Sequence, residues 1–249
     1  MSKRKPERLI AIADNHGDMI DEITAKALFA FINDYKPSIR LHLGDAFDFR
    51  NLRVKASDEE KAMSLEEDWD AGTDFLYRYF IGGKQNVLLY GNHDDRLFQL
   101  AKSSNGLHRD YANERIEKLK HLQKLLHYKT LPYDARLGVY QYGKLKAVHG
   151  YYCGRNAGAR HGATFGNVIF GHTHTVEATP IETVNGIEEA RGIGCICKTD
   201  MGYDARNPNK LRHRNGWVYG TIKTDGTYDI FQTARVGDDF LCATKFARY

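Results

Sequence analysis

Residues 86–94 read NVLLYGNHD, and they decide how the rest of the chain is interpreted. The apolar run 86–90 predicts a short buried strand. Gly91 follows it, and a glycine lets the backbone turn sharply and come close to a bound ion. Asn92, His93 and Asp94 come next. The strand is therefore expected to end in amide, imidazole and carboxylate side chains.

Four further motifs repeat this arrangement of a strand followed by ligand-type side chains. Strands are expected at 8–13, 39–43 and 168–170, and in a hairpin at 138–148 around Gly143-Lys144. They lead, respectively, into D-x-H at 14–16, G-D-x-x-D at 44–48, G-H-x-H at 171–174 and His149-Gly150. Functional sites collect at the carboxyl ends of strands in α/β sheets. These motifs are therefore candidates for a shared site.

The remaining pattern predicts the architecture. Apolar residues at helical spacing predict helices over 21–35, 56–80 and 110–127. The second half is mostly strands, with hairpin turns expected at Asn185-Gly186 and Asp225-Gly226. This order predicts an α/β protein with two sheets that share one core and are flanked by helices. Without a linker or repeat, residues 1–249 are expected to form a single domain.

Composition excludes several classes of protein. Of the 249 residues, 42% are apolar and 27% charged, which is ordinary for a folded soluble chain and argues against disorder. No stretch approaches the roughly 20 apolar residues of a membrane-spanning helix. The apolar run that stops at Asp14 is too short for a signal peptide. Lys and Arg exceed Asp and Glu by 36 − 32 = +4, which permits a nucleic-acid partner without demanding one.

The cysteines and the histidines outside the motifs receive structural interpretations. The four cysteines form no CxxC pair, so a reduced, cytoplasmic chain is expected. Cys195 and Cys197 are interpreted as partly buried small side chains rather than as metal ligands. His42 is expected to be buried or paired, and His161 is left undecided. Solvated positions are expected for His108, His121, His127 and His213.

The motifs contain seven typical metal ligands. Their mixture of imidazole and carboxylate groups favours Mn, Fe, Zn or Co over an all-oxygen Mg or Ca site. In extended backbone, side chains at i and i+2 face the same way, so D-x-H and G-H-x-H would each present two ligands to one volume. Seven ligands are too many for one four-coordinate ion and suit two ions about 3.5–4 Å apart. The candidates are Asp14, His16, Asp45, Asn92, His149, His172 and His174.

The order of these motifs resembles that of the calcineurin-like metallophosphoesterase superfamily. The matching residues run from Asp14 to His174, about two thirds of the chain. The resemblance implies a four-layer αββα fold, a β-sandwich of two mixed sheets flanked by helices with a two-metal site at its top. The compact length and the residues 212–217 are similar to small members encoded by bacteriophages, which would place the chain in a host cytoplasm.

The resemblance also implies a role for each motif residue. It gives the first ion Asp14, His16, Asp45 and His174, and the second ion Asp45, Asn92, His149 and His172, so that Asp45 bridges. Mn²⁺ is the first expectation for both ions, with Fe, Zn, Co or Ni as alternatives. A hydroxide shared by the ions would attack phosphorus. His93 would face the leaving group as a proton donor, and Asp48 would orient its ring.

The substrate is expected to be a phosphate ester. The protein Ser/Thr phosphatases of the superfamily have an arginine directly after G-D-x-x-D, where this chain has Phe49. Arg50 and Arg96 lie just beyond metal motifs and are predicted to bind substrate. They favour a phosphodiester of nucleic acid or nucleotide, with a phosphomonoesterase and a non-catalytic scaffold as alternatives. The basic cluster Lys210, Arg212 and Arg214 is interpreted as solvated surface. The oligomeric state is left open.

Overall fold

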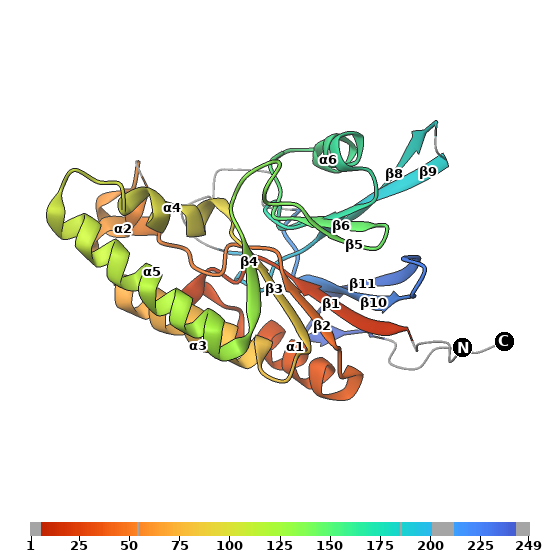
Figure 1. The fold of residues 1–249 in the computed structure, drawn as a ribbon, viewed down its shortest axis with the longest axis horizontal. Helices are drawn as coiled ribbons and strands as arrows, with labels where there is room; N and C mark the ends of the chain where they lie inside the picture. The colour runs from red at the N-terminus through yellow and green to blue at the C-terminus, as the bar shows by residue number, and fades with distance from the viewer. Residues whose placement is uncertain (1–5, 54, 185, 201–211, 243–249) are drawn as a thin grey trace.

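Two mixed β-sheets lie face to face in the computed structural model, which describes residues 6–53, 55–184, 186–200 and 212–242 (Figure 1). The larger sheet has the order β12-β11-β10-β1-β2-β3-β4, and the smaller has β5-β6-β7-β9-β8. Strands β1 to β4 of the larger sheet are mutually parallel, and β10 runs antiparallel to β1. The larger sheet is formed by β1 (Glu7–Ile12), β2 (Ile39–His42), β3 (Gln85–Leu89), β4 (Tyr128–Leu131), β10 (Gly216–Ile222), β11 (Tyr228–Val236) and β12 (Asp239–Phe240). The smaller sheet is formed by β5 (Tyr140–Tyr142), β6 (Leu145–Val148), β7 (Val168–Phe170), β8 (Val176–Thr183) and β9 (Gly186–Ile193).

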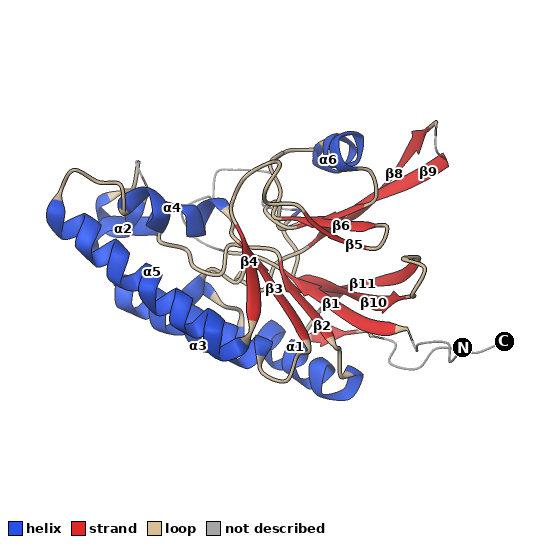
Figure 2. Cartoon of the chain, viewed as in Figure 1, coloured by secondary structure: helices blue, strands red, loops and turns tan. Residues whose placement is uncertain are grey.

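Helices cover the outer faces of both sheets (Figure 2). The outer face of the larger sheet packs against α1 (Glu22–Tyr35), α3 (Leu65–Phe80) and α5 (Gly106–Leu126). Helix α6 (Ala157–Phe165) lies on the outer face of the smaller sheet, against β7, β8 and β9. The layers therefore run helix, sheet, sheet, helix, and the predicted fold class is confirmed.

The alternation along β1 shows how the two apolar layers arise. Leu9, Ala11 and Ala13 point into the core between the sheets, whereas Ile10 and Ile12 point into the core under the helices. All five side chains are fully buried. Successive side chains of a strand point to opposite faces. A parallel strand covered on both faces therefore needs an unbroken apolar run, as this one has.

Several predicted elements differ in extent from the observed ones. Residues 56–80 form two helices, α2 (Asp58–Ala62) and α3, because Ser64 begins a new helix by accepting a hydrogen bond from the Glu67 amide. Helix α5 begins earlier than predicted, at an Asn105 cap. Helix α4 (Asn92–Leu100), helix α6 and strand β4 were not predicted.

Two sequence expectations remain partly open. Strands β8 and β9 form the hairpin that the Asn185-Gly186 signal predicts, with Thr183 paired to Gly186, while Asn185 itself lies outside the described residues. The single domain over 1–249 stays a prediction. In the described part of the chain, no helix combines the length and apolarity needed to cross a membrane.

Candidate metal centre

The loops that follow the central strands have an unusual backbone. Five predicted ligands have positive φ: Asp14 (57°), His16 (51°), Asp45 (52°), His172 (65°) and His174 (53°). A left-handed conformation at a non-glycine residue costs of order 1–3 kcal/mol and persists only where surrounding structure enforces it. The expectation of extended backbone at D-x-H and G-H-x-H is therefore wrong. Paired ligands reach one volume because the loops turn, not because alternate residues share a strand face.

Backbone hydrogen bonds hold these turns in place. The Asp14 amide donates to the Gly44 carbonyl and the His16 amide to the Asp45 carbonyl, both at 3.0 Å. The loop after β1 thus continues to pair with the loop after β2. The Asp14 carbonyl accepts from the amides of Ile196 and Cys197 at 3.1 and 3.0 Å. The segment around residue 196, which the sequence left without a functional role, therefore holds the backbone of Asp14, the first predicted ligand.

Glycines leave room for the ligand side chains. A Cβ atom at Gly91 would lie 2.0 Å from Asp45 Oδ1, and one at Gly171 would lie 2.7 Å from Asp14 Oδ2. A Cβ carbon essentially never comes closer than about 3.0 Å to a non-bonded heavy atom. Any larger residue at these two positions would displace a carboxylate of the cluster.

One group of side chains gathers around the imidazole of His16. His16 Nε2 lies 3.1 Å from His174 Nε2 and 3.9 Å from both Asp14 Oδ1 and Asp45 Oδ2. His174 Nε2 lies 3.6 Å from Asp14 Oδ1. Ligands at about 2.1 Å from a tetrahedral ion are separated by about 3.4 Å, so these spacings suit a single cation. Asp14 Oδ1 is buried and has no hydrogen-bond partner, which is the state of an acceptor that a cation would satisfy.

A second group gathers around His149. His149 Nε2 lies 3.1 Å from Asn92 Oδ1 and 3.3 Å from Asp45 Oδ2. Asp45, His149 and His172 each offer a ligand atom, and these atoms lie within 4.8 Å of one another. Asp45 Oδ2 thus faces both groups, while Asp45 Oδ1 accepts from the His93 amide at 2.8 Å. The residues present fit two divalent cations that share Asp45.

Electrostatics keep the carboxylates ionised. Burial raises the pKa of Asp45, but the neighbouring imidazoles of His149 and His93 lower it by a larger amount. The pKa of Asp45 therefore lies well below its usual range. Burial lowers the pKa of His149, but Asp45 raises it to about 9. Burial lowers the pKa of His172 to about 4. The negative charge of the pocket is thus balanced by protons on histidine, which a bound cation would displace.

Asp48 connects His16 to His93. Its Oδ1 accepts from His93 Nδ1 at 2.6 Å and from His16 Nδ1 at 3.3 Å, and its Oδ2 accepts from Arg50 Nε at 2.6 Å. Burial raises the pKa of Asp48, but the two histidine hydrogen bonds lower it far below the usual range. An ionised Asp48 requires a proton on His93 Nδ1. His93 Nε2 is left to face the cluster, 4.0 Å from Asp45 Oδ2.

The two arginines predicted to bind substrate occupy different environments. Arg50 is only 7% exposed, and its guanidinium is bound to Asp48 and Asp18. These contacts hold Asp48 in place, and they occupy the guanidinium that was predicted to bind substrate. Arg96 is partly buried and donates to the Asp48 carbonyl at 2.8 Å. Arg212 pairs with Glu177, Arg214 is exposed, and Lys210 lies outside the described residues.

Two further carboxylates position the loop at 44–49, and sequence reasoning missed both. Asp94 accepts from the amides of Asp45, Gly91 and Phe47 at 2.8, 2.8 and 3.1 Å. Asp68 accepts from the amides of Asp48 and Phe49 at 2.9 and 2.6 Å. Asp68 lies in the predicted helical region 56–80 and is buried. The sequence signal that could have identified Asp68 is its helical spacing from the apolar Phe75, which places both residues on the same buried face of α3.

Sulfur and imidazole groups line the outside of the cluster. Cys153 Sγ lies 3.0 Å from His172 Nε2, and Cys197 Sγ lies 3.8 Å from His174 Nδ1. Cys195 and Cys197 are fully rather than partly buried, and Cys197 also belongs to a possible metal-binding group with His16 and His174. His213 was expected to be solvated. It is instead partly buried, with its ring 4.9 Å from that of His174.

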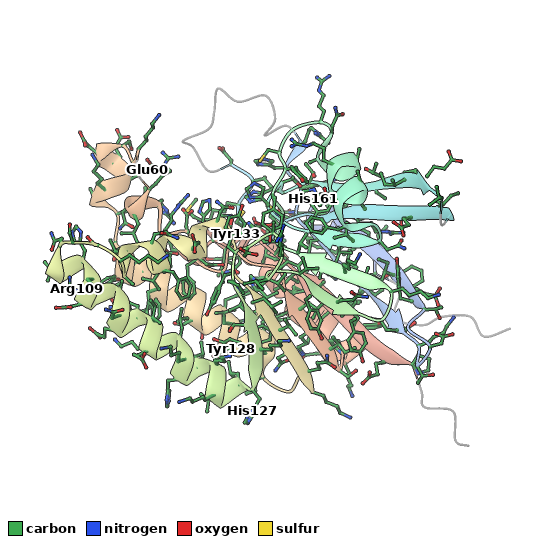
Figure 3. The ribbon with its side chains drawn as sticks, turned by 45° about the horizontal axis from the view of Figure 1, so that its top comes forward. Glu60, Arg109, His127, Tyr128, Tyr133 and His161 are labelled. Carbon is green, nitrogen blue, oxygen red and sulfur yellow. The ribbon has the colours of Figure 1, made fainter. Side chains whose placement is uncertain are left out.

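Two buried histidines outside the cluster have structural partners. His42 contacts Asn15 Oδ1 through Nε2 at 2.6 Å and accepts from the Gly44 amide at 3.1 Å. His161 accepts from the Tyr151 amide at 3.0 Å and contacts the Ala157 carbonyl at 2.8 Å. His161 lies over the smaller sheet in Figure 3. Burial lowers the pKa of His42 to about 3 and that of His161 to about 4.

Comparisons with known proteins give fold likenesses only. No family model and no curated protein matches the chain. Its structure is similar to YfcE, a phosphoesterase from E. coli, at 16% identity and a TM-score of 0.40, over 91% of this chain and 98% of that chain. It is also similar to Vacuolar Protein Sorting 29 from Cryptosporidium parvum (12% identity, TM-score 0.42, 92% of this chain and 98% of that chain). A phosphatase from Mycoplasma pneumoniae is similar at 11% identity and a TM-score of 0.43, over 92% of this chain and 94% of that chain. At these TM-scores the likenesses carry no argument about chemistry.

Proposed function

We propose that this chain is a two-metal phosphoesterase of the calcineurin-like metallophosphoesterase superfamily. The observation that carries the proposal is Asp45 Oδ2, which faces His16 Nε2 at 3.9 Å and His149 Nε2 at 3.3 Å. A single carboxylate oxygen between two imidazole groups suits a ligand shared by two cations. The first cation would be held by Asp14, His16, Asp45 and His174, and the second by Asp45, Asn92, His149 and His172.

The proposed chemistry divides between the metals and the protein. Two divalent ions held there would attract the phosphate and acidify a water that attacks phosphorus. His93 would protonate the departing oxygen through Nε2, because Nδ1 is held as a donor by Asp48. Arg50 would keep Asp48 ionised and in place. The nitrogen and oxygen donor set supports Mn²⁺ first, with Fe, Zn, Co and Ni as the alternatives.

For the substrate we favour a phosphodiester of nucleic acid or nucleotide over a phosphomonoester. The support is Arg96, which lies one helical turn after Asn92 and is partly exposed beside the cluster. A scaffold without catalysis ranks last, because His93 and Asp48 are both present and are hydrogen-bonded at 2.6 Å. A reducing cytoplasm suits a site bordered by an exposed thiol at Cys153.

The test compares bis(p-nitrophenyl) phosphate with p-nitrophenyl phosphate after the chain has been stripped of metal and reloaded with Mn²⁺. Fe²⁺, Zn²⁺, Co²⁺ and Ni²⁺ are loaded in parallel, and Lys84→Ala, far from the cluster, is the control. We expect faster turnover of the diester and none after chelation. Faster turnover of the monoester would reverse the substrate preference. No turnover with any of the metals would refute the proposed activity and favour the scaffold.

A further inference from the structure

A cavity of about 850 Å³ begins beside the proposed second metal position. One wall is helix α4, from Asn92 to its carboxyl end, and the other is the segment around the 3₁₀ helix η2 (Arg50–Leu52). Asn92 belongs to both the cluster and the cavity lining. A ligand bound in the cavity would therefore reach the place where the proposed reaction occurs. The volume is within the roughly 300–1,000 Å³ of ligand-binding sites.

The lining of this cavity is strongly basic. It contains Arg53, Lys55, Arg96 and Lys102 against one acidic residue, Asp95, so its formal charge is 4 − 1 = +3. The whole chain has a net charge of +4. A formal charge of +3 over ten lining residues is a much higher density of positive charge than +4 over 249 residues. A concave surface with one sign of charge attracts ligands of the opposite sign.

The four cations are not equally available to a ligand. Arg53 is paired with Glu60 at 2.6 Å, and Arg96 donates to the Asp48 carbonyl. Lys55 and Lys102 are exposed. Lys55 follows η2 and Lys102 follows α4, so the two lysines belong to the two segments that line the cavity. These two lysines are therefore the side chains best able to contact phosphates.

The length and chemistry of the cavity favour a strand of nucleic acid over a small molecule as its ligand. Lys102 lies ten residues after Asn92, which corresponds to about 15 Å at the α-helical rise. That distance spans roughly four nucleotides of a strand that is stacked as in B-DNA, at about 3.4 Å per nucleotide. Leu52 and Leu100 contribute apolar surface. Among the described lining residues none is aromatic, so recognition would rest on phosphate contacts rather than base stacking.

We propose that this cavity is a groove that binds a single-stranded nucleic acid through its phosphates and leads the strand to the metal centre. This inference rests on the proposed phosphoesterase function and names its substrate class. Lys55 and Lys102 contact phosphates on opposite sides of the strand. Because the contacts are electrostatic, binding depends strongly on salt and weakly on base sequence.

Binding is measured with the full chain by fluorescence anisotropy of a labelled 12-residue oligo-dT, in EDTA so that no turnover occurs. The variants are Lys55→Ala, Lys102→Ala and their double, with Lys84→Ala as the charge-matched control. We expect the double variant to weaken binding roughly tenfold and to reduce the slope of log K against log salt by about 1.4, at about 0.7 for each phosphate contact. Lys84→Ala should change neither.

Two results would refute the proposal that this cavity binds a single-stranded nucleic acid. One is a double variant that binds the 12-mer with wild-type affinity and salt dependence. The other is a labelled dinucleotide that binds wild type as tightly as the 12-mer, which would indicate a small ligand. Turnover of bis(p-nitrophenyl) phosphate separates this test from the proposed function. Turnover without oligonucleotide binding refutes the groove alone, whereas lysine-dependent binding without turnover refutes the activity alone.

Discussion

Replacing Asp68 by alanine removes the two carboxylate oxygens that accept hydrogen bonds from the Asp48 and Phe49 amides. The N···O distances of these bonds are 2.9 and 2.6 Å. A buried amide without an acceptor costs about 1–3 kcal/mol, so the loss is about 2–6 kcal/mol for the two. Burial raises the pKa of Asp68 from 3.8 to about 6. Removing that buried charge at pH 7 therefore raises the free energy of unfolding by about 3 kcal/mol. The two effects nearly offset each other, so we expect little change in stability at neutral pH.

The effect of Asp68→Ala on turnover is not offset in this way. Asp48 orients His93, and loosening its backbone moves the proposed proton donor. Removing a residue that orients a catalytic group or ligand typically costs about 10–100-fold. The assay is kcat for bis(p-nitrophenyl) phosphate, together with the metal content of the same sample. Asp68→Asn keeps the size and one acceptor, so its loss should be smaller. Asp70→Ala, on an exposed position of the same helix, is the matched control.

The pH dependence of stability gives a second readout for Asp68. Because its pKa is higher in the folded than in the unfolded chain, the folded protein binds more protons between about pH 4 and 6. Wild type therefore loses up to about 3 kcal/mol relative to Asp68→Ala as the pH rises through that window. Urea unfolding of both proteins at pH 4 and 7 measures this difference. Equal kcat in Asp68→Ala and Asp70→Ala, with no pH-dependent difference in unfolding, would refute the reasoning.

Three further predictions test other parts of the structure. His93→Asn should retain both metals by elemental analysis and lose most turnover; full turnover would remove His93 from the chemistry. Asp45→Asn should lose metal because both groups share its Oδ2, and unchanged metal content would contradict the shared ligand. Burial holds the pKa of His161 at about 4, so wild type should lose up to about 3 kcal/mol of stability as the pH falls from 6.5 to 4. Thermal unfolding of His161→Phe should show a flatter pH profile in that window, whereas exposed His108→Gln should follow wild type.

The layers of the fold and the candidate ligands can be predicted from the amino-acid sequence. Apolar runs such as residues 86–90 predict buried strands because period and burial are local properties of the chain. The order of strands and helices then limits how they can pack. The ligand types could be read directly because metal chemistry depends on the functional group, and each group followed a predicted strand.

The surroundings of those candidate ligands depend on contacts between distant parts of the chain, which form on folding. The left-handed backbone at Asp14 and His16 arises from pairing with a loop about 30 residues away, so no local pattern predicts it. Asp68 reaches the loop at Asp48 from another helix, and Arg50 is bound between two carboxylates rather than exposed to substrate. A charge of +4 spread over 249 residues indicates no partner, but +3 in the lining of one cavity does. Electrostatic attraction depends on the distances between charges, and only folding sets those distances.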